Sequence, residues 1–471
     1  MIGLSGGRMG EPGTSAVEAV GAPPGAPPGA RLGLPQATAL VVGNVVGTGI
    51  FLLPASLAAV GTISLPVLAV TTVGAMAVAV VLGRLGARIP AGGGPYAYAR
   101  EAFGEFAGFW TAWSFWLTAW AGNAGAAVAW VGYVDYFLGW HGTTAGVVLG
   151  LAGIWAAAAV NLTGVRSMGR FQLATTVLKF LPLVLVAVAG LFFLEVANFG
   201  PLVEGGGSVW DAAWLAAGLI LFAYSGMESV AIVAERLADP ARDVGRASVL
   251  GVAACGALYL LVTVAVFGTV PHDRLAHSTA PFADAVEAMA GGGLGGELWG
   301  GVLAACAIAA GLGVLNGWTL LVAEMPLAAA RDGMFPRAFA RLTPRGVPAV
   351  GVVTGAALTS LMLVFAYASE NAFATILLFA SFTSAVPYFF SAAAQLLWLR
   401  TRGRSAHRRR AVADTAVAVA ALLFATAMVY GAGERAVMLG VLALLAGVPV
   451  YIRAKARRGE YGPRETAVQG S

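Results

Sequence analysis

Long apolar runs separated by short polar stretches fill the chain from residue 36 to residue 453. A helix needs about 20 apolar residues to cross the hydrocarbon core of a bilayer. Runs of this length, bounded by charges or by Gly and Pro, predict an all-α integral membrane protein with twelve spans. Their ranges are 36–60, 64–88, 102–137, 143–163, 168–194, 209–234, 246–270, 297–330, 347–368, 371–399, 411–432 and 435–453.

Charged residues are scarce and unevenly placed. Apolar residues make up 59% of the chain and charged residues 11%, too few charges to cover a water-soluble protein. With both termini in the cytoplasm, every Lys and Arg except Lys179, Arg274 and Arg435 falls on the inner side. The positive-inside rule therefore predicts a multi-pass protein of the cytoplasmic (inner) membrane, with the lipid bilayer as its partner. The pI is high, about 9.4, because basic residues gather on the predicted inner side of the membrane. It is therefore no indication of nucleic-acid binding.

The first predicted span carries three glycines in seven residues, Gly43-Asn44-Val45-Val46-Gly47-Thr48-Gly49. Glycine lets a helix unwind and expose backbone N–H and C=O groups, which are tolerated at this depth only around a protein-lined cavity. A half-helix N-terminus there attracts a carboxylate and a half-helix C-terminus attracts an ammonium. The alternative is that the small residues only allow close helix packing.

The sixth predicted span contains a second interruption, which runs from Phe222 through Gly226 to Ser229 and includes the carboxylate of Glu228. It follows the first interruption by five spans. Matching breaks in two five-helix halves are typical of an inverted-repeat transporter with its binding site at the midplane. The pair of breaks therefore predicts a transport site, with both segments facing one central cavity.

Two further charges lie within predicted spans, Lys179 in the fifth and Glu324 in the eighth. They lie at comparable depths, so a structural ion pair is one interpretation. A buried lysine can also serve as a proton carrier, because burial shifts its pKa readily. Both interpretations stay open at this point.

Several motifs predict no chemistry. The stretch Gly92-Gly93-Gly94-Pro95 lacks the ending of a phosphate loop and predicts a turn. The four histidines fall in connections between the predicted spans, so we expect no metal site and no cofactor.

Several segments together resemble the amino acid, polyamine and organocation transporter superfamily, and within it the bacterial arginine/agmatine antiporter and its basic amino acid/polyamine antiporter relatives. The segments are GNVVGTGIFLLPASLA (43–58), GGGPYAYAREAFG (92–104), WLTAWAGN (116–123), YSGMESV (224–230), NGWTLL (316–321) and AARDGMFP (329–336). The resemblance implies a leucine-transporter-like fold, with spans one to five and six to ten as inverted repeats. Residues 1–34, which are rich in Gly, Pro and Ala, predict a disordered cytoplasmic tail. A transport core (35–400), spans eleven and twelve (401–454) and a cytoplasmic C-terminal tail (455–471) follow.

The resemblance also implies a set of site residues. The substrate carboxylate would meet the N–H groups of Thr48 and Gly49, and its amino group the carbonyls of Val45 and Phe222. The remaining substrate-binding positions are Thr118, Ala119, Asn123, Ser225, Trp318 and Ala380. The positions for gating or proton coupling are Glu228, Lys179, Glu324 and Tyr388.

Two positions depart from the antiporter. Phe222 stands where the antiporter has a tryptophan stacked on the guanidinium, and Ala380 stands where it has a serine. Cation-π attraction is weaker at Phe than at Trp, so these departures disfavour arginine as the substrate but do not affect recognition of an α-amino acid backbone. Lys179 resembles a span-five lysine of sodium-independent family members, whose ammonium replaces a sodium ion.

The expected function is secondary active transport of amino acids or related amines, independent of sodium, by exchange or coupled to protons. The rival is a membrane nutrient sensor that binds its ligand without moving it. An embedded enzyme would need a nucleophile–base pair or a metal cluster within the spans, and the sequence suggests neither. A homodimer remains open.

Overall fold

The computed structural model describes residues 33–47, 49–140, 142–163, 178–180, 182–232, 234, 237–368, 372–401 and 408–459. Every regular element in these ranges is a helix. The α-helices are α1 (Leu34–Val45), α2 (Gly49–Ala58), α3 (Ser64–Arg88), α4 (Pro95–Phe103), α5 (Glu105–Leu138), α6 (Thr143–Thr163), α8 (Val209–Ala223), α9 (Ser229–Ile232), α10 (Pro240–Thr269), α11 (His272–Ala276), α12 (Pro281–Met289), α13 (Gly293–Arg331), α14 (Ala349–Tyr367), α15 (Ala372–Thr401), α16 (Arg408–Gly431), α17 (Gly433–Leu445) and α18 (Gly447–Arg457). Short 3₁₀ helices cover Val196–Phe199, Glu204–Gly206 and Arg337–Ala340.

Eight helical segments in the described ranges are long and apolar enough to cross a membrane, and the bent pair α1–α2 makes a ninth. The chain is thus an all-helical, multi-pass membrane protein, as the apolar runs predicted. Two of the other predicted spans contain shorter apolar helices, Leu178–Gly190 and α8. The remaining predicted span, 102–137, corresponds to α5.

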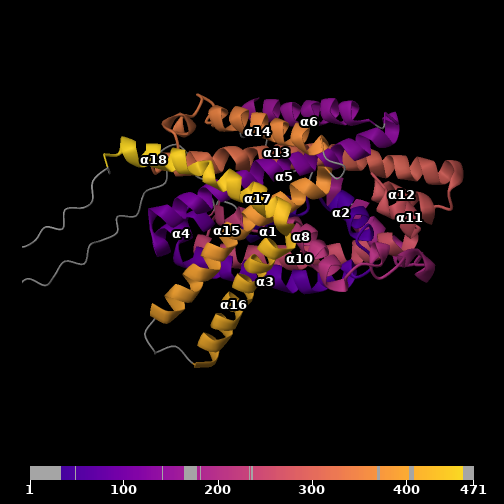
Figure 1. The fold of residues 1–471 in the computed structure, drawn as a ribbon, viewed down its shortest axis with the longest axis horizontal. Coiled ribbons are helices and arrows are strands. Elements are labelled where there is room, and N and C mark those ends of the chain that lie inside the picture. Colours follow the sequence, from indigo (N-terminus) through magenta and orange to yellow (C-terminus); the bar gives the residue numbers. More distant parts are fainter. Residues whose placement is uncertain are drawn as a thin grey trace, which may run out of the picture.

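The 34-residue helix α5 lies at the centre of the bundle, against α13 and α15 (Figure 1). At 1.5 Å per residue it is about 50 Å long, enough to span a bilayer. Most of its residues are buried, including the polar Thr118 and Asn123. Because α5 contacts other helices and not lipid along most of its length, its residues can be small, aromatic or polar, and it needs less hydropathy than a peripheral span.

The helices α3 and α10 pack along each other, and α1 packs against α10. The axes of α1 and α2 differ by 42° across the first predicted break. The Gly92–Gly94 stretch forms a turn, as predicted, with positive φ at Gly93 and Gly94. Helix α4 follows this turn, and its Tyr96 hydroxyl donates to Asp332 Oδ2 (2.7 Å) just beyond the end of α13.

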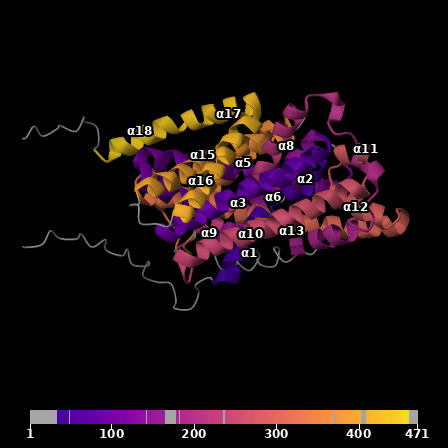
Figure 2. The same cartoon turned by 90° about the horizontal axis from the view of Figure 1, so that it is seen from below.

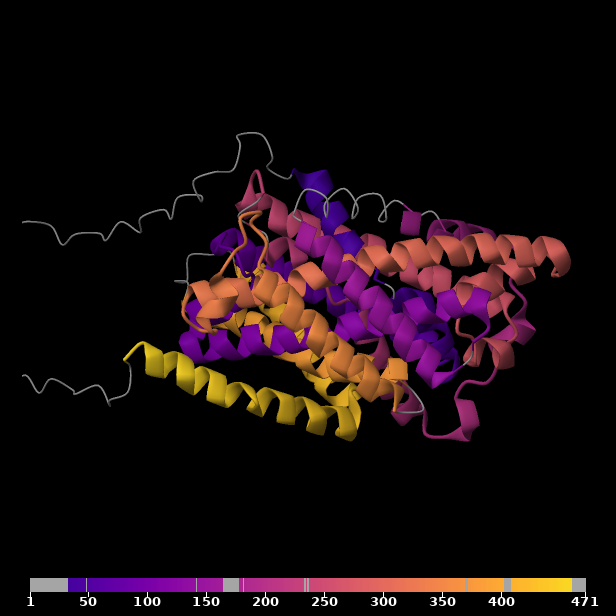
Figure 3. The same ribbon diagram turned by 90° about the horizontal axis from the view of Figure 1, so that it is seen from above.

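The C-terminal helices α17 and α18 run along the outside of the bundle (Figures 2 and 3). The sequence predicted one span here, and the structure has two helices joined at Ala446. Arg458, just after α18, makes two hydrogen bonds to the carboxylate of Glu105 (3.1 and 2.8 Å) at the start of α5. This bidentate pair fixes the end of α18 to the core.

Candidate functional site

The first helix break lies between α1 and α2. Helix α1 ends at Val45, the chain leaves helical geometry at Val46, and α2 begins at Gly49. Two side chains from other helices bind carbonyls of α1 that approach the break. The Lys179 ammonium donates to the Gly43 carbonyl, and the Tyr259 hydroxyl donates to the Val45 carbonyl (2.6 Å). Lys179 and Tyr259 are both buried, so these carbonyls are satisfied without water.

The second break lies between α8 and α9 and is built largely from its own residues. The Glu228 carboxylate accepts from the Gly226 N–H (3.2 Å to each oxygen) and from the Tyr388 hydroxyl (2.8 Å). The Ser229 hydroxyl donates to the Gly226 carbonyl. Glu228 is only 2% exposed, so a carboxylate is held in the middle of the bundle by donors that suit its charge.

The two breaks touch each other. Gly226 has φ of 107°, and a Cβ there would lie 2.9 Å from the backbone carbonyl carbon of Asn44. Only glycine permits both this conformation and this approach. Tyr259 of α10 donates to Val45 before the first break and also contacts the Ala223 carbonyl (3.1 Å) before the second. One hydroxyl therefore ties both interrupted helices together.

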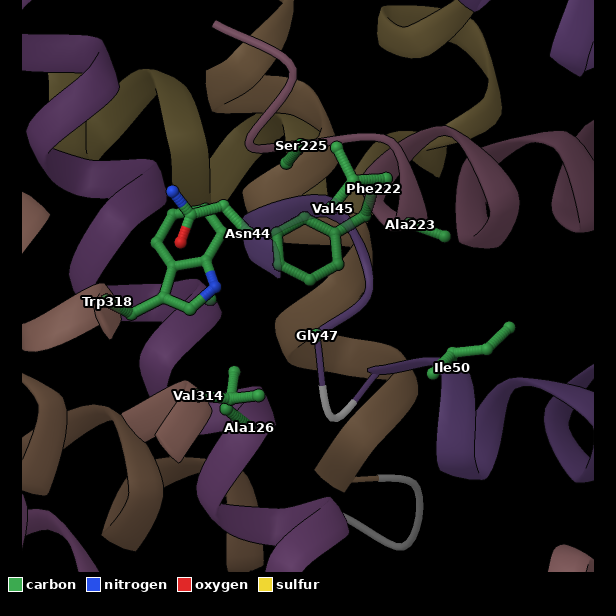
Figure 4. Close-up of a pocket in the computed structure, with 11 residues that line it drawn as sticks. Asn44, Val45, Gly47, Ile50, Ala126, Phe222, Ala223, Ser225, Val314 and Trp318 are labelled. Atoms are coloured by element: carbon green, nitrogen blue, oxygen red, sulfur yellow. The ribbon is translucent and has the colours of Figure 1, made fainter. Parts of the chain in front are cut away.

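A small cavity lies where the breaks meet (Figure 4). Its volume is about 20 Å³, roughly the space of one water molecule. Phe222 from α8 and Trp318 from α13 stack across it, with ring centroids 6.5 Å apart and planes 26° apart. The lining residues are Asn44, Val45, Gly47, Ile50, Gly122, Ala126, Phe222, Ala223, Ser225, Val314 and Trp318. A ligand as large as an amino acid would fit only if this cavity widened.

Four predicted substrate-binding residues line this cavity: Val45, Phe222, Ser225 and Trp318. Of the two proposed carboxylate-binding positions, Thr48 lies outside the described residues, and Gly49 is the first residue of α2. The carbonyls assigned to the substrate amine already have partners in this conformation. Val45 accepts from Tyr259, and Phe222 accepts from the Ser225 N–H (2.8 Å).

The predicted residues on α5 and α15 lie behind the cavity wall. The hydroxyls of Thr118 and Thr383 are 2.8 Å apart, and Ser384 reaches both Thr118 (3.4 Å) and Ser225 (3.3 Å). A buried chain of hydroxyls therefore connects the second break to α5. Ala119 and Ala380 are fully buried and are not among the lining residues.

Asn123 follows the cavity-lining Gly122 on α5. Its amide nitrogen donates to the Thr319 hydroxyl (3.2 Å), while its Oδ1 is buried and has no hydrogen-bond partner among the described residues. An unsatisfied buried amide oxygen is costly, and such groups are explained by local strain, a functional role, or a bound water or ion. Asn123 is thus a predicted binding residue that lies beside the cavity with an acceptor available.

The predicted gating residues fall into two groups. Glu228 and Tyr388 bind each other directly, as described above. Lys179 is 1% exposed and lies beside the first break, whereas Glu324 is half-buried on α13. The pairing of Lys179 with Glu324 stays a prediction, and the partner that the structure gives Lys179 is Gly43.

Sequence reasoning missed Tyr259, Gly122 and Ser384. Tyr259 is a polar residue at the middle of an apolar run, which is a usable signal. A Cβ at Gly122 would lie 2.7 Å from Phe222 Cζ, so this glycine makes room for the ring. No local pattern marks Gly122 in a helix that already contains several small residues.

We compared the sequence with known protein families and known proteins. The amino acid permease family matches residues 32–451. An arginine/ornithine antiporter of Pseudomonas aeruginosa is 31% identical over 91% of this chain and 92% of its own. A putative arginine/ornithine antiporter of Escherichia coli K12 is 30% identical, over 90% and 92%. Putrescine transporter PotE of Haemophilus influenzae is 27% identical, over 89% and 96%.

The family match covers both helix breaks, the cavity and the buried Glu228–Tyr388 pair. The relatives match nine-tenths of the chain, so the similarity is not limited to one motif. The chain therefore belongs to the amino acid permease family of the amino acid, polyamine and organocation transporter superfamily.

Proposed function

We propose that this chain is a secondary active transporter that moves amino acids or related amines across the cytoplasmic membrane. The observation that carries the proposal is the contact between the two helix breaks, with a cavity lined by residues of both. Interrupted helices that meet inside a bundle present free helix ends to a small molecule, and rocking around such a site gives alternating access. The stacked Phe222 and Trp318 represent a closed state of that site.

The proposal includes the number of spans, their orientation and the internal repeat. The chain crosses the membrane twelve times, with both termini in the cytoplasm, and spans one to five and six to ten form inverted repeats. The position of the α8–α9 break, five predicted spans after the α1–α2 break, supports the repeat. The distribution of Lys and Arg between the connections supports the orientation. Spans eleven and twelve lie outside the repeats.

The substrate carries an amine. None of the described cavity-lining residues is charged, and the break that supplies Ser225 also holds the buried carboxylate of Glu228. A positive group in the cavity would therefore meet a negative neighbour at low dielectric, where such attraction is strong. The names of the relatives point to arginine, ornithine and putrescine. The phenylalanine at 222 favours amines that do not depend on stacking a guanidinium.

Transport proceeds without sodium, by exchange or with protons. The Lys179 ammonium already occupies a position against the Gly43 carbonyl beside the first break. A fixed cation there supplies positive charge to exposed carbonyls and leaves less need for a bound metal cation. Glu228 and Lys179 are buried ionisable groups, one at each break, that could exchange protons during the cycle.

Counterflow in proteoliposomes tests the proposal. Vesicles loaded with ornithine, arginine, putrescine or a neutral amino acid are diluted into the labelled compound, with and without sodium. We expect accumulation with at least one amine-bearing substrate and equal rates in the two salts. Binding without any counterflow would favour the membrane sensor, which the names of the relatives do not support. A requirement for sodium would remove the role given to Lys179.

The variant Trp318→Leu tests whether the cavity is the binding site. Removing one stacked ring should weaken substrate binding by about tenfold, because large aromatics supply much of the contact area in small-molecule sites. Thermal stability should change less than binding does. A loss of stability with unchanged affinity would mean that Trp318 only packs α13 against α8.

A further inference from the structure

A second, larger cavity lies away from the helix breaks, between the C-terminal ends of α3 and α15 and the start of α16. Its volume is about 240 Å³. Its polar lining comes from Arg84 and Arg88 of α3, Gln395 of α15 and Asp414 of α16, and Trp398 forms an aromatic wall. This composition differs from the central cavity, which has no charged lining residue among those described.

Arg84 is only partly satisfied in this cavity. Its Nη2 lies 2.7 Å from Asp414 Oδ1, which is a single contact and not a bidentate one. Its Nη1 is buried and has no hydrogen-bond partner among the described residues. A guanidinium presents two parallel donors to a carboxylate or phosphate. The Nη1 group is therefore a donor whose acceptor is not supplied by the described residues.

Arg88 and Trp398 complete the site. The Arg88 guanidinium lies 4.3 Å from the centroid of the Trp398 ring, a cation-π distance that leaves the edge of the guanidinium available to an acceptor. With Asp414, the two arginines give the lining a net charge of one positive unit. A single negative charge would neutralise it, whereas a dianion would leave an excess.

The position of the cavity indicates where the anion comes from. It lies in the last turns of two membrane-spanning helices, at the depth where Trp, Arg and lipid headgroups meet. Helix α16 begins in the sequence with three arginines, Arg408 to Arg410, at the same end of the bundle. Basic pockets between membrane helices bind the headgroups of anionic lipids.

We propose that this cavity, which we call the α3–α16 site, binds the phosphodiester of an anionic phospholipid, with Arg84 Nη1 and Arg88 as donors. A phosphodiester carries one negative charge and several acceptor oxygens, which matches the charge of the lining and its unused donor. The site is separate from the central cavity, so the assignment holds whatever the chain transports.

Lipid binding to the purified full-length protein tests this assignment. Retention of phosphatidylglycerol is titrated by native mass spectrometry, with phosphatidylcholine and inorganic phosphate as the two comparison ligands. We expect phosphatidylglycerol to bind at least about tenfold more tightly than phosphatidylcholine, because a charge-assisted hydrogen bond contributes about this much. Inorganic phosphate should not displace it at matched concentration.

Two variants separate a lipid site from a structural ion pair. Arg84→Gln should lower phosphatidylglycerol affinity by about tenfold, and Asp414→Asn should raise it several-fold, because the second change frees Nη2 for the lipid. Both variants break the same ion pair, so a purely structural role would shift them in the same direction. Arg345→Gln, an exposed arginine in the connection that follows α13, removes the same charge elsewhere and should leave affinity unchanged.

Three results would overturn the assignment. One is equal binding of phosphatidylglycerol to the wild type and Arg84→Gln. Another is a loss of affinity in Asp414→Asn that equals the loss in Arg84→Gln. The third is displacement of the lipid by inorganic phosphate at matched concentration, which would make the site one for a soluble anion.

Discussion

The break between α1 and α2 and the break between α8 and α9 differ in where their hydrogen-bond partners come from. Beside the first break, Gly43 and Val45 are bound by Lys179 and Tyr259, which lie 136 and 214 residues further along the chain. At the second break, Gly226 is bound on both sides by its near neighbours, Glu228 and Ser229. The first break therefore depends on side chains of distant residues, whereas the second combines such contacts, from Tyr388 and Ser384, with hydrogen bonds between its own residues.

This difference has a consequence for motion. A segment whose bonds are local keeps its shape when the surrounding helices move, whereas one held by other helices responds to their displacement. We therefore expect the first break to change its geometry during alternating access and the second to move as a unit. The contact of Gly226 with Asn44 and the hydroxyl of Tyr259 couple the two.

The largest expected effect comes from Gly226→Ala, which disrupts the contact between the two breaks. A non-glycine residue at this φ costs on the order of 1–3 kcal/mol, and the added Cβ would lie 2.9 Å from the Asn44 backbone. Exchange should fall by on the order of 100-fold, the loss that a misplacement of about 1 Å can produce at a functional site. Counterflow and a thermal melt of the purified variant measure the two effects.

Gly104→Ala is the matched control for Gly226→Ala. Gly104 also has positive φ (85°), but nothing lies within 4 Å of its Cβ position. Gly104→Ala therefore has the free-energy cost of an alanine at positive φ but no steric clash with a neighbouring segment. If both variants exchange at the same rate, strain alone explains the loss and the contact between the breaks is irrelevant to transport.

The next effect in size is expected from Lys179→Met, which removes a donor at the first break. The Gly43 carbonyl would lose this buried hydrogen bond, at a cost of about 1–3 kcal/mol. Exchange should drop by about tenfold or more, measured across pH with and without sodium. Lys455→Met, a change of the chain's other lysine near the end of α18, should leave exchange unaltered. Wild-type exchange in Lys179→Met would show that the first break does not depend on this ammonium.

The sequence predicted the helical membrane fold and the two breaks, because both depend on local composition. Apolar runs of bilayer length and glycines at the middle of a span are visible without any long-range information. Glu228 was also found in this way, since a carboxylate in an apolar run has few explanations. The family resemblance added Trp318, which lies in the cavity wall.

The partners that hold the first break were only partly predictable. Lys179 stood out as a charge in an apolar run, but its carbonyl partner, Gly43, depends on how two helices dock. Tyr259 and Gly122 act through contacts more than 90 residues away in sequence, at Val45 and Phe222. The joint between α17 and α18 was also missed within the single predicted span, although Gly447 and Pro449 directly follow Ala446 and a proline removes a helical hydrogen bond.

A smaller effect is expected from Tyr259→Phe, which loosens the tie between the breaks. The change deletes hydrogen bonds to Val45 and Ala223 and keeps the packing of the ring, so the protein should lose about 1–2 kcal/mol. Exchange should fall by about five- to tenfold. Combined with Lys179→Met the two losses should be non-additive, because both residues act on the first break. Strict additivity would mean that the two carbonyls respond independently.

The smallest effect is expected from Tyr388→Phe at the second break. Glu228 loses the Tyr388 hydroxyl but keeps both contacts with the Gly226 N–H, so the segment retains its local bonds. The loss should be about 1 kcal/mol in stability, with exchange reduced about two- to threefold. Tyr96→Phe is the matched control, because Tyr96 is also buried and its hydroxyl also donates to a carboxylate, Asp332 Oδ2 (2.7 Å), which belongs to neither break. Because the second break keeps these local bonds, Tyr388→Phe should reduce exchange less than Tyr259→Phe does. A larger loss in Tyr388→Phe would reverse the comparison between the two breaks.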